Sequence, residues 1–342
     1  MTNQKLSPTQ SAQARANSYD LFSQLFLHGL TAETLPIVQM IPELAATLPD
    51  TLDLDRAAAE HQRLFGLNLF PFQSIFLDPS GLVGGDEADR VAAAYAECGF
   101  VPLATGEGID HIGQQLACLA FLCAAEAEAL EDGKAAIALR VQRLQQNFLN
   151  QHLLRWLPPL VCTLQRQDNP LFAAIADLLI GLVDIHLAGL EAHSPFTITG
   201  SPFTLPTPPD LLTKDDTTLH DIAIYFLRPA WCGLDLTRSE LTQIGRQLQI
   251  PSGFAERETQ FVNLLRTASQ YDHFAALLSK LAERIEHDKR YYQEFPFLSR
   301  SVHASAALWM QRLEKSEQLL EELKKMAITQ QTAAEHGAQA AS

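Results

Sequence analysis

Apolar residues recur every three or four positions along most of the chain, and this spacing predicts helices. The first predicted helix carries Tyr19, Phe22, Leu25 and Phe26 on one face and should end near Gly29. No stretch alternates apolar and polar residues in the way a half-buried strand does. The predicted fold class is therefore all-α, a helical bundle followed by a smaller C-terminal helical region.

Two stretches interrupt this periodicity. Residues 66–85, GLNLFPFQSIFLDPSGLVGG, crowd aromatic side chains among prolines and glycines and predict an irregular loop. Residues 192–217 are rich in proline and predict a linker. The predicted divisions are a disordered N-terminus over 1–16, a helical domain over 17–191, the linker over 192–217, a C-terminal helical region over 218–326 and a disordered tail over 327–342.

The segment from Gly106 to Leu130 places ionisable side chains directly before a strongly apolar helix. Asp110 stands where an N-cap is expected, and His111 falls in the first turn, where the helix dipole favours a neutral imidazole. Glu107 or Asp110 could nevertheless hold a charge on that ring. Capping alone explains Asp110, and a binding site is the alternative interpretation.

The C-terminal region also has clear helix signals. Thr237 to Glu240 form a capping box, with a threonine followed three residues later by a glutamate. The last predicted helix runs from about Ser301 to Met326 and has an apolar seam with a period near 3.5 residues. The seam residues are Val302, Ala306, Trp309, Leu313, Ser316, Leu320 and Leu323. Such a seam can bind a partner helix or pack back on its own chain.

The charge of the chain argues against one class of partner. The formal net charge is −15, and the lysines and arginines are scattered along the sequence. We therefore expect no nucleic-acid partner, because a phosphate backbone is bound by clustered basic residues. The acidic balance favours a cationic partner, although an acidic surface also serves solubility alone.

The sequence predicts a cytoplasmic protein that does not insert stably into a membrane. The first residues lack the basic and apolar regions of a secretory signal. The most apolar segment, Leu171 to Leu190, is interrupted by Asp177, Asp184 and His186, so a membrane span is not expected. The five cysteines form no CxxC pair and are expected to be reduced, mostly buried thiols.

Motifs for catalysis are absent from the sequence. It contains no phosphate-binding glycine loop, no HExxH, no GxSxG and no paired ExxH, so we predict no cofactor, no metal site and no catalytic residue. Asp110-His111 is the reverse of the His-Asp doublet of helical metal phosphohydrolases. The chain is accordingly predicted not to be an enzyme.

Three segments together resemble the TorD/DmsD/NarJ family of cytoplasmic chaperones for molybdenum-containing redox enzymes. Leu64-Phe65 followed by Phe70 to Leu77 is similar to the family's PPYESVYL-type loop. Glu107-x-x-Asp110-His111 is similar to its E-x-x-D-H loop, and Phe148 to Pro158 to its F-x-x-x-H-L-x-x-W-x-P segment. The resemblance covers about residues 14–190 and leaves the helices after Leu219 unassigned.

This resemblance implies a TorD-like helical fold and a chaperone that binds a molybdoenzyme subunit. The client contact would be the twin-arginine signal peptide, the apoprotein or both, during cofactor insertion and before export or assembly. The implied peptide-binding residues are Glu107, Asp110, His111, Phe72, Ser74, Phe76 and Leu77. In this interpretation the acids meet the arginines of the peptide and the aromatic loop forms an apolar wall. Gln73 stands where the family commonly has Glu, and Phe72 where it often has Tyr.

Two rival functions remain. One is a non-catalytic helical scaffold or assembly factor that acts through the C-terminal seam, with Asp110 serving only as a cap. The other is an all-α hydrolase that acts through His111. A homodimer is also compatible with a helical protein of this kind, because helices can be exchanged between protomers.

Overall fold

The computed structural model describes residues 6–193, 203–213, 216–251 and 255–340. Within these residues the secondary structure is helical, and the sole β-type contact is an isolated bridge between Phe72 and His111. The all-α prediction is confirmed. The chain divides into two compact units, one of residues 1–204 with 296–306 and the other of residues 205–295 with 307–342.

The helices follow each other with short connections up to the linker. Their bounds are α1 Pro8–His28, α2 Leu35–Met40, α3 Pro42–Ala45, α4 Leu54–Phe65, α5 Gln73–Leu77, α6 Gly85–Cys98, α7 Ile112–Glu131, α8 Ala135–Gln151, the 3-10 helix η1 Leu153–Arg155, α9 Leu157–Gln165, α10 Pro170–His193, α11 Leu219–Phe226, α12 Pro229–Cys232, α13 Arg238–Gln247, α14 Arg257–Gln270, α15 Phe274–Glu294 and α16 Arg300–Ala340.

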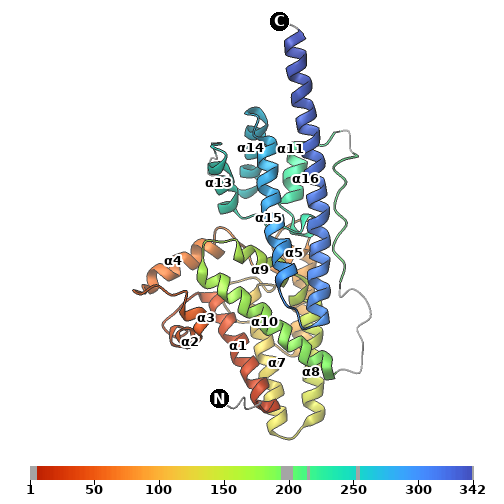
Figure 1. The fold of residues 1–342 in the computed structure, drawn as a ribbon. Helices are drawn as coiled ribbons and strands as arrows, with labels where there is room; N and C mark the ends of the chain where they lie inside the picture. The colour runs from red at the N-terminus through yellow and green to blue at the C-terminus, as the bar shows by residue number, and fades with distance from the viewer. Residues whose placement is uncertain (1–5, 194–202, 214–215, 252–254, 341–342) are drawn as a thin grey trace. The chain divides into compact units, whose positions relative to one another are not determined.

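Helices α1, α7, α8 and α10 form the core of the first unit (Figure 1). Helices α1 and α7 approach closely at Gly113, where a Cβ atom would lie 2.4 Å from Leu27. The hydroxyl of Ser23 donates to the Gly113 carbonyl over 2.8 Å at the same crossing. A glycine at the start of α7 therefore fixes how the helix that follows the acidic loop packs against α1.

The chain starts its first helix earlier than the sequence predicted. A capping box of Ser7 and Gln10 begins α1 at Pro8, and Ala12 and Ala16 are buried. The expected disorder is therefore wrong for residues 8–16, because alanines at helical spacing supply a buried face there. Residues 1–5 lie outside the described part of the chain. The predicted end of the helix near Gly29 is confirmed.

Helix α10 is long and apolar enough to cross a membrane by composition, with a mean hydropathy of 2.0 over Pro170–Ala192. The interruption by Asp177, Asp184 and His186 therefore does not bring this segment below the hydropathy of a membrane span, contrary to the sequence-based expectation. Its polar groups are nevertheless used inside the first unit. Asp184 accepts the backbone N–H groups of Leu298 and Ser299, each over 2.8 Å. His186 contacts Tyr19 and Gln145 through its two ring nitrogens, each over 3.0 Å. These contacts are those of a core helix.

The second unit follows its local sequence signals. Thr237 and Glu240 form the predicted capping box of α13, and a second box of Thr218 and Asp221 begins α11. All seven residues of the α16 seam are buried, so its use in packing within this chain is confirmed. Ser316, the polar member of the seam, donates to the Cys232 carbonyl over 2.8 Å.

Two predicted boundaries differ from the structure. Helix α16 continues to Ala340, whereas its predicted end was Met326 and the tail over 327–342 was expected to be disordered. Residues 296–306 belong to the first unit, although they were predicted to lie in the C-terminal region. The division between the units after Thr204 falls inside the predicted linker, of which residues 194–202 and 214–215 lie outside the described part.

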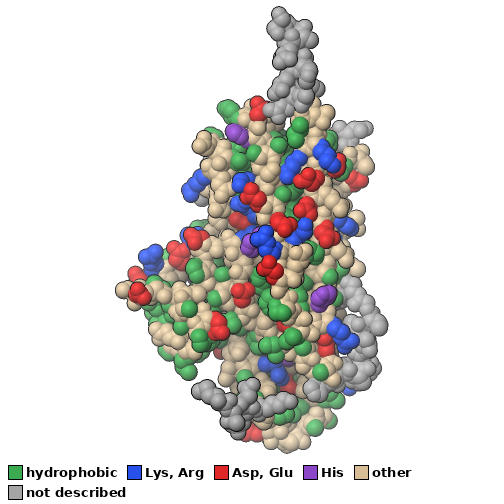
Figure 2. Space-filling model, viewed as in Figure 1, with side chains coloured by type: hydrophobic (Ala, Val, Ile, Leu, Met, Phe, Trp, Pro, Cys, Tyr) green, Lys and Arg blue, Asp and Glu red, His purple; other side chains and the backbone are tan. Residues whose placement is uncertain are grey.

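Acidic and basic side chains are interspersed on the face shown in Figure 2. Within the second unit several of them are paired along the helices, such as Lys289 with Glu317 and Lys280 with Glu283. On this face there is no continuous basic stripe.

Candidate functional site: two paired loops over a buried polar network

The loop before α5 and the loop before α7 are joined through their backbones. Phe72 and His111 form the antiparallel bridge. The N–H of Gln73 donates to the Asp110 carbonyl over 3.1 Å, and the N–H of Ile112 donates to the Pro71 carbonyl over 2.9 Å. Two of the three motif segments are therefore held side by side, although about 40 residues separate them in the sequence.

Asp110 caps a different helix from the one predicted. Its carboxylate accepts the backbone N–H of Ser74 over 2.8 Å, at the N-terminus of α5. The side chain is 1% exposed. The prediction that Asp110 is the N-cap of the following helix is wrong, because the antiparallel pairing turns its carboxylate toward the preceding loop. An anion at a helix N-terminus is favourable, and here it binds the two loops together.

His111 is the N-cap of α7. Its Nδ1 accepts the N–H of Gly113 over 3.0 Å, and its ring packs edge-on against Phe72 with centroids 5.0 Å apart. Burial, with the nearby charge of His61, lowers the pKa of His111 to about 3. The ring is therefore neutral with its proton on Nε2, as the helix-dipole argument predicts.

Two glutamines link these loops to the third motif segment. Gln115 in α7 donates to Gln73 over 3.0 Å and accepts the indole N–H of Trp156 over 3.3 Å. Gln73 in turn donates to Glu87 over 2.7 Å. At position 73 an amide can both accept from Gln115 and donate to a carboxylate, which an ionised Glu cannot do.

Glu87 lies at the centre of the network and was missed by the sequence analysis. It is 5% exposed and pairs with Arg155 through two hydrogen bonds of 2.7 and 3.2 Å, and also with Arg90. Burial alone would raise the pKa of Glu87, but the hydrogen bonds and charge of Arg155, with Gln73 and Arg90, lower it below its usual value. The one local signal was an acid in the first turn of α6, which is common at helix starts.

Most of the predicted binding residues are buried. Phe76 and Ser74 are 0% exposed, and Phe76 packs against Trp156 with ring centroids 5.3 Å apart. Six of the seven predicted residues are buried, namely Phe72, Ser74, Phe76, Leu77, Asp110 and His111. Glu107 alone presents an exposed side chain. The structure thus brings the predicted residues together, with one acid at the surface and the others beneath it.

Exposed apolar side chains stand at both ends of these loops. Leu82 and Val83 lie just before α6 and are 68% and 51% exposed, and Val101 and Leu103 follow α6 and are 81% and 39% exposed. Gln114 anchors the Leu103 backbone by two hydrogen bonds of 2.9 and 2.8 Å. A peptide with apolar side chains can be bound by such a surface.

The buried histidines His186 and His152 differ in their contacts. His186 forms hydrogen bonds at both ring nitrogens. His152 is 8% exposed, yet its Nδ1 finds no hydrogen-bond partner in the described part of the chain. Burial, with the charge of Arg155, lowers the pKa of His152 to about 4, so it is neutral.

Metal ligands do not gather among the described residues, where no group of three His, Cys, Asp or Glu side chains could hold an ion. Four of the five cysteines are buried and all are unbridged, as expected for reduced thiols. Cys232 is fully buried, and burial raises its pKa to about 12. A reactive thiolate is therefore not favoured there.

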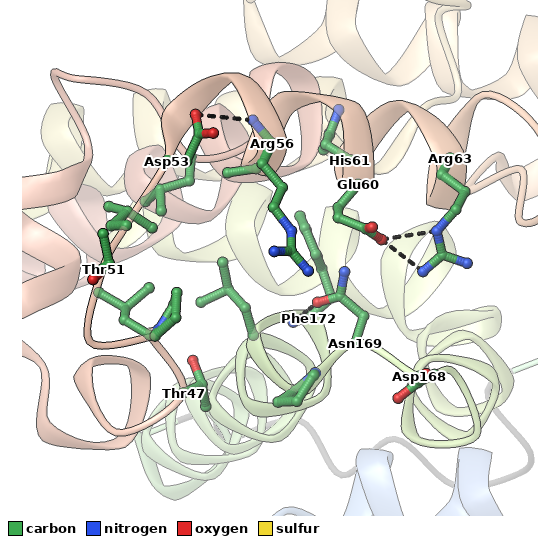
Figure 3. Close-up of a pocket in the computed structure, with 17 residues that line it drawn as sticks. Thr47, Thr51, Asp53, Arg56, Glu60, His61, Arg63, Asp168, Asn169 and Phe172 are labelled. Atoms are coloured by element: carbon green, nitrogen blue, oxygen red, sulfur yellow. Dashed lines mark hydrogen bonds and ion pairs between the residues drawn. The ribbon is translucent and has the colours of Figure 1, made fainter.

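A cavity of about 480 Å³ lies between α4 and the start of α10 (Figure 3). Arg56 extends into it toward Asn169 and Phe172, and Glu60 pairs with Arg63 at its rim. None of the predicted binding residues lines this cavity. Its acidic and basic groups are mixed, so its charge does not favour a ligand of either sign.

Comparison with known proteins gives two matches. Residues 32–161 match the family described as nitrate reductase delta subunit. A curated relative is the selenate reductase assembly chaperone protein of Thauera selenatis, 35% identical over 86 residues. That alignment covers 25% of this chain and 43% of the relative. No solved structure matches.

Proposed function

Because residues 32–161 match the nitrate reductase delta subunit family, we propose that this protein is a system-specific assembly chaperone for a molybdenum redox enzyme. Its client is the catalytic subunit, bound through the twin-arginine signal peptide, the apoprotein or both. Binding takes place in the cytoplasm during cofactor insertion, before export or assembly. The protein contributes no catalysis and no cofactor of its own.

The observation that carries this proposal is the meeting of three distant segments in one network. The loop of Phe70 to Leu77, the loop of Glu107 to His111 and the segment with Trp156 are joined by hydrogen bonds through Gln73 and Gln115. These are the same segments that resemble the chaperone family in sequence. The buried polar groups of these segments fix the conformation of the two loops that form the surface. None of these groups is arranged as an acid–base pair for a reaction.

Within this site we assign different roles to the buried and exposed residues. Asp110, His111, Ser74 and the buried aromatic side chains fix the shape of the paired loops. Glu107 meets an arginine of the signal peptide at the surface, and apolar side chains such as Leu103 meet its apolar region. The six buried residues therefore act on the client through the loops that they hold.

A pull-down from the native cytoplasm with mass-spectrometric identification tests the function. We expect the catalytic subunit of a molybdoenzyme among the specifically bound proteins. A bound fraction without any molybdoenzyme subunit would overturn the proposal.

Calorimetric titration with the leader peptide of the recovered subunit tests the role of Glu107. Glu107→Gln should weaken binding by up to about fivefold, because an exposed arginine–carboxylate pair is worth at most about 1 kcal/mol. The loss should shrink at high salt. Glu128→Gln, which changes an exposed acid on α7 away from the paired loops, is the control and should bind normally. Equal affinity of both variants for the peptide would show that Glu107 does not contribute to binding.

The two rival functions have less support. A scaffold that acts through the seam of α16 needs those side chains at the surface, and they are buried. A hydrolase acting through His111 needs access to a ring that is 3% exposed and accepts a backbone hydrogen bond. Titration with divalent metals and nucleotides, followed by an assay for hydrolysis, tests the hydrolase function. Turnover in this assay would support it.

A further inference from the structure

A groove runs along α6 and the end of α8, beside the polar network. One part, of about 540 Å³, is lined by residues that include Arg90, Glu97, Arg155 and Phe203. A second part, of about 270 Å³, lies toward Cys98. The two parts share Ala94, Glu97, Gln151 and His152. All of these residues belong to the first unit.

Phe203 from the linker lines one end of this groove, next to Arg155. Its side chain is 9% exposed, and the guanidinium carbon of Arg155 lies 5.7 Å from the centre of its ring. A guanidinium over an aromatic face is a favourable contact, strongest where water is excluded. Arg155 itself is held in place by Glu87, so it offers a rigid platform for an aromatic or apolar side chain.

The groove also has an unused hydrogen-bonding group. His152 lines both parts, is buried, and its Nδ1 has no partner in the described residues. Leaving such a group buried without a partner costs about 1–3 kcal/mol, so native proteins seldom do it without a structural or functional reason. An occupant that forms a hydrogen bond with His152 Nδ1 would remove this cost.

The groove and the paired loops are both next to α6. Arg90 and Glu97 of this helix line the groove, and the exposed Val83 and Val101 flank the helix at its two ends. An extended peptide at the paired loops can therefore reach the groove along α6. Phe203 and Thr204, which line the groove, have neither helix nor strand structure, so an extended segment fits there.

We propose that Phe203 is an internal surrogate for the client, held in a subsite on Arg155 that takes an apolar side chain from the apolar region of the signal peptide. This inference rests on the proposed function and deepens it. The linker and the peptide compete for one subsite, so the free chaperone is partly self-blocked. A client that binds must displace Phe203, which couples occupancy of the groove to release of the linker.

Calorimetry on the full chain tests this competition, with a synthetic peptide of the leader recovered in the pull-down. If the subsite is open in about a tenth of the molecules, Phe203→Ala should tighten binding about tenfold. Leu212→Ala is the matched control, since Leu212 lies in the same linker, is 45% exposed and lines no part of the groove. Its affinity should equal that of the wild type.

Fluorescence of Phe203→Trp, compared with that of the wild type, gives a second readout. The additional emission should shift to the red when the peptide is bound, because the ring at position 203 has left Arg155 for water. Unchanged or weaker binding by Phe203→Ala, or an unchanged emission of Phe203→Trp, would overturn the surrogate role while leaving the chaperone function intact. Absence of binding by every variant, the wild type included, would instead overturn the proposed function, and the surrogate role with it.

Discussion

Polar side chains cap the N-termini of both α7 and α13, but their hydrogen-bond partners lie at different distances in the sequence. At α13, Thr237 accepts the N–H of Glu240, and Glu240 accepts the N–H of Thr237, so each partner lies three residues away. At α7, His111 caps the helix, while Asp110 bonds Ser74 from a segment 36 residues earlier. The first start stabilises one helix, and the second ties two loops together. The proposed client site depends on contacts of the second kind, which join segments distant in the sequence.

Acidification should act strongly on the start of α7. The pKa values of His111 and His186 are lowered to about 3, below the value near 6.5 of an unfolded histidine. Between these values the unfolded chain binds a proton that the folded chain does not, so stability is complete above about pH 6.5 and is lost as the pH falls. From pH 7 to pH 5 the two histidines should together cost about 4 kcal/mol.

Hydrogen exchange at the α7 amides checks this acid effect against those of α13. His111→Asn should retain a cap and remove about a third of the pH dependence, because His152, with its pKa lowered to about 4, contributes nearly as much as His111 and His186. An α7 that is equally protected at pH 5 and pH 7 would show that its histidine cap is not the sensitive element.

Removing the centre of the network should have the next largest effect. Glu87→Gln leaves Arg155 buried without its anionic partner and should lower the free energy of unfolding by about 3 kcal/mol. Denaturant unfolding measures this change. Glu97→Gln, on the same helix and without an ion pair among the described residues, should change stability by less than about 0.5 kcal/mol. Equal effects of the two would show that the network does not stabilise the paired loops.

Asp110→Ala should destabilise the protein by about 2 kcal/mol, because it leaves the buried N–H of Ser74 without an acceptor. The loss should appear in the α5 loop and in α7 together, since Asp110 joins them. Client binding should weaken as the loops separate. Segment-resolved hydrogen exchange tests this. A loss of protection confined to α7 would support the alternative in which Asp110 only caps α7.

Thr237→Ala should have the smallest effect, about 1 kcal/mol, as is usual for a lost N-cap. Its effect should be confined to α13, and client binding should remain as in the wild type. Measured by the same exchange experiment, a change that spread to α7 would contradict the contrast between the local and the long-range helix start.

The helices were predicted from sequence where their signals are local. The capping box at Thr237, the end of α1 at Gly29 and the buried seam of α16 each depend on residues within one or two turns. The early start of α1 at Pro8 was missed because small alanines form its buried face there. The site was harder, because Asp110 has the spacing of a cap for the helix that follows it.

The sequence by itself determined the helices, the acidic charge and the three motif segments of this protein. Only the tertiary structure decided that Asp110 bonds Ser74, that Gln73 meets Glu87, and that Phe203 lies over Arg155. The physical reason is range. A helix is encoded by neighbours within a few residues, whereas these contacts join residues 14 to 48 positions apart. Their partners depend on how the two loops pair and on which buried polar groups still need a hydrogen-bond partner.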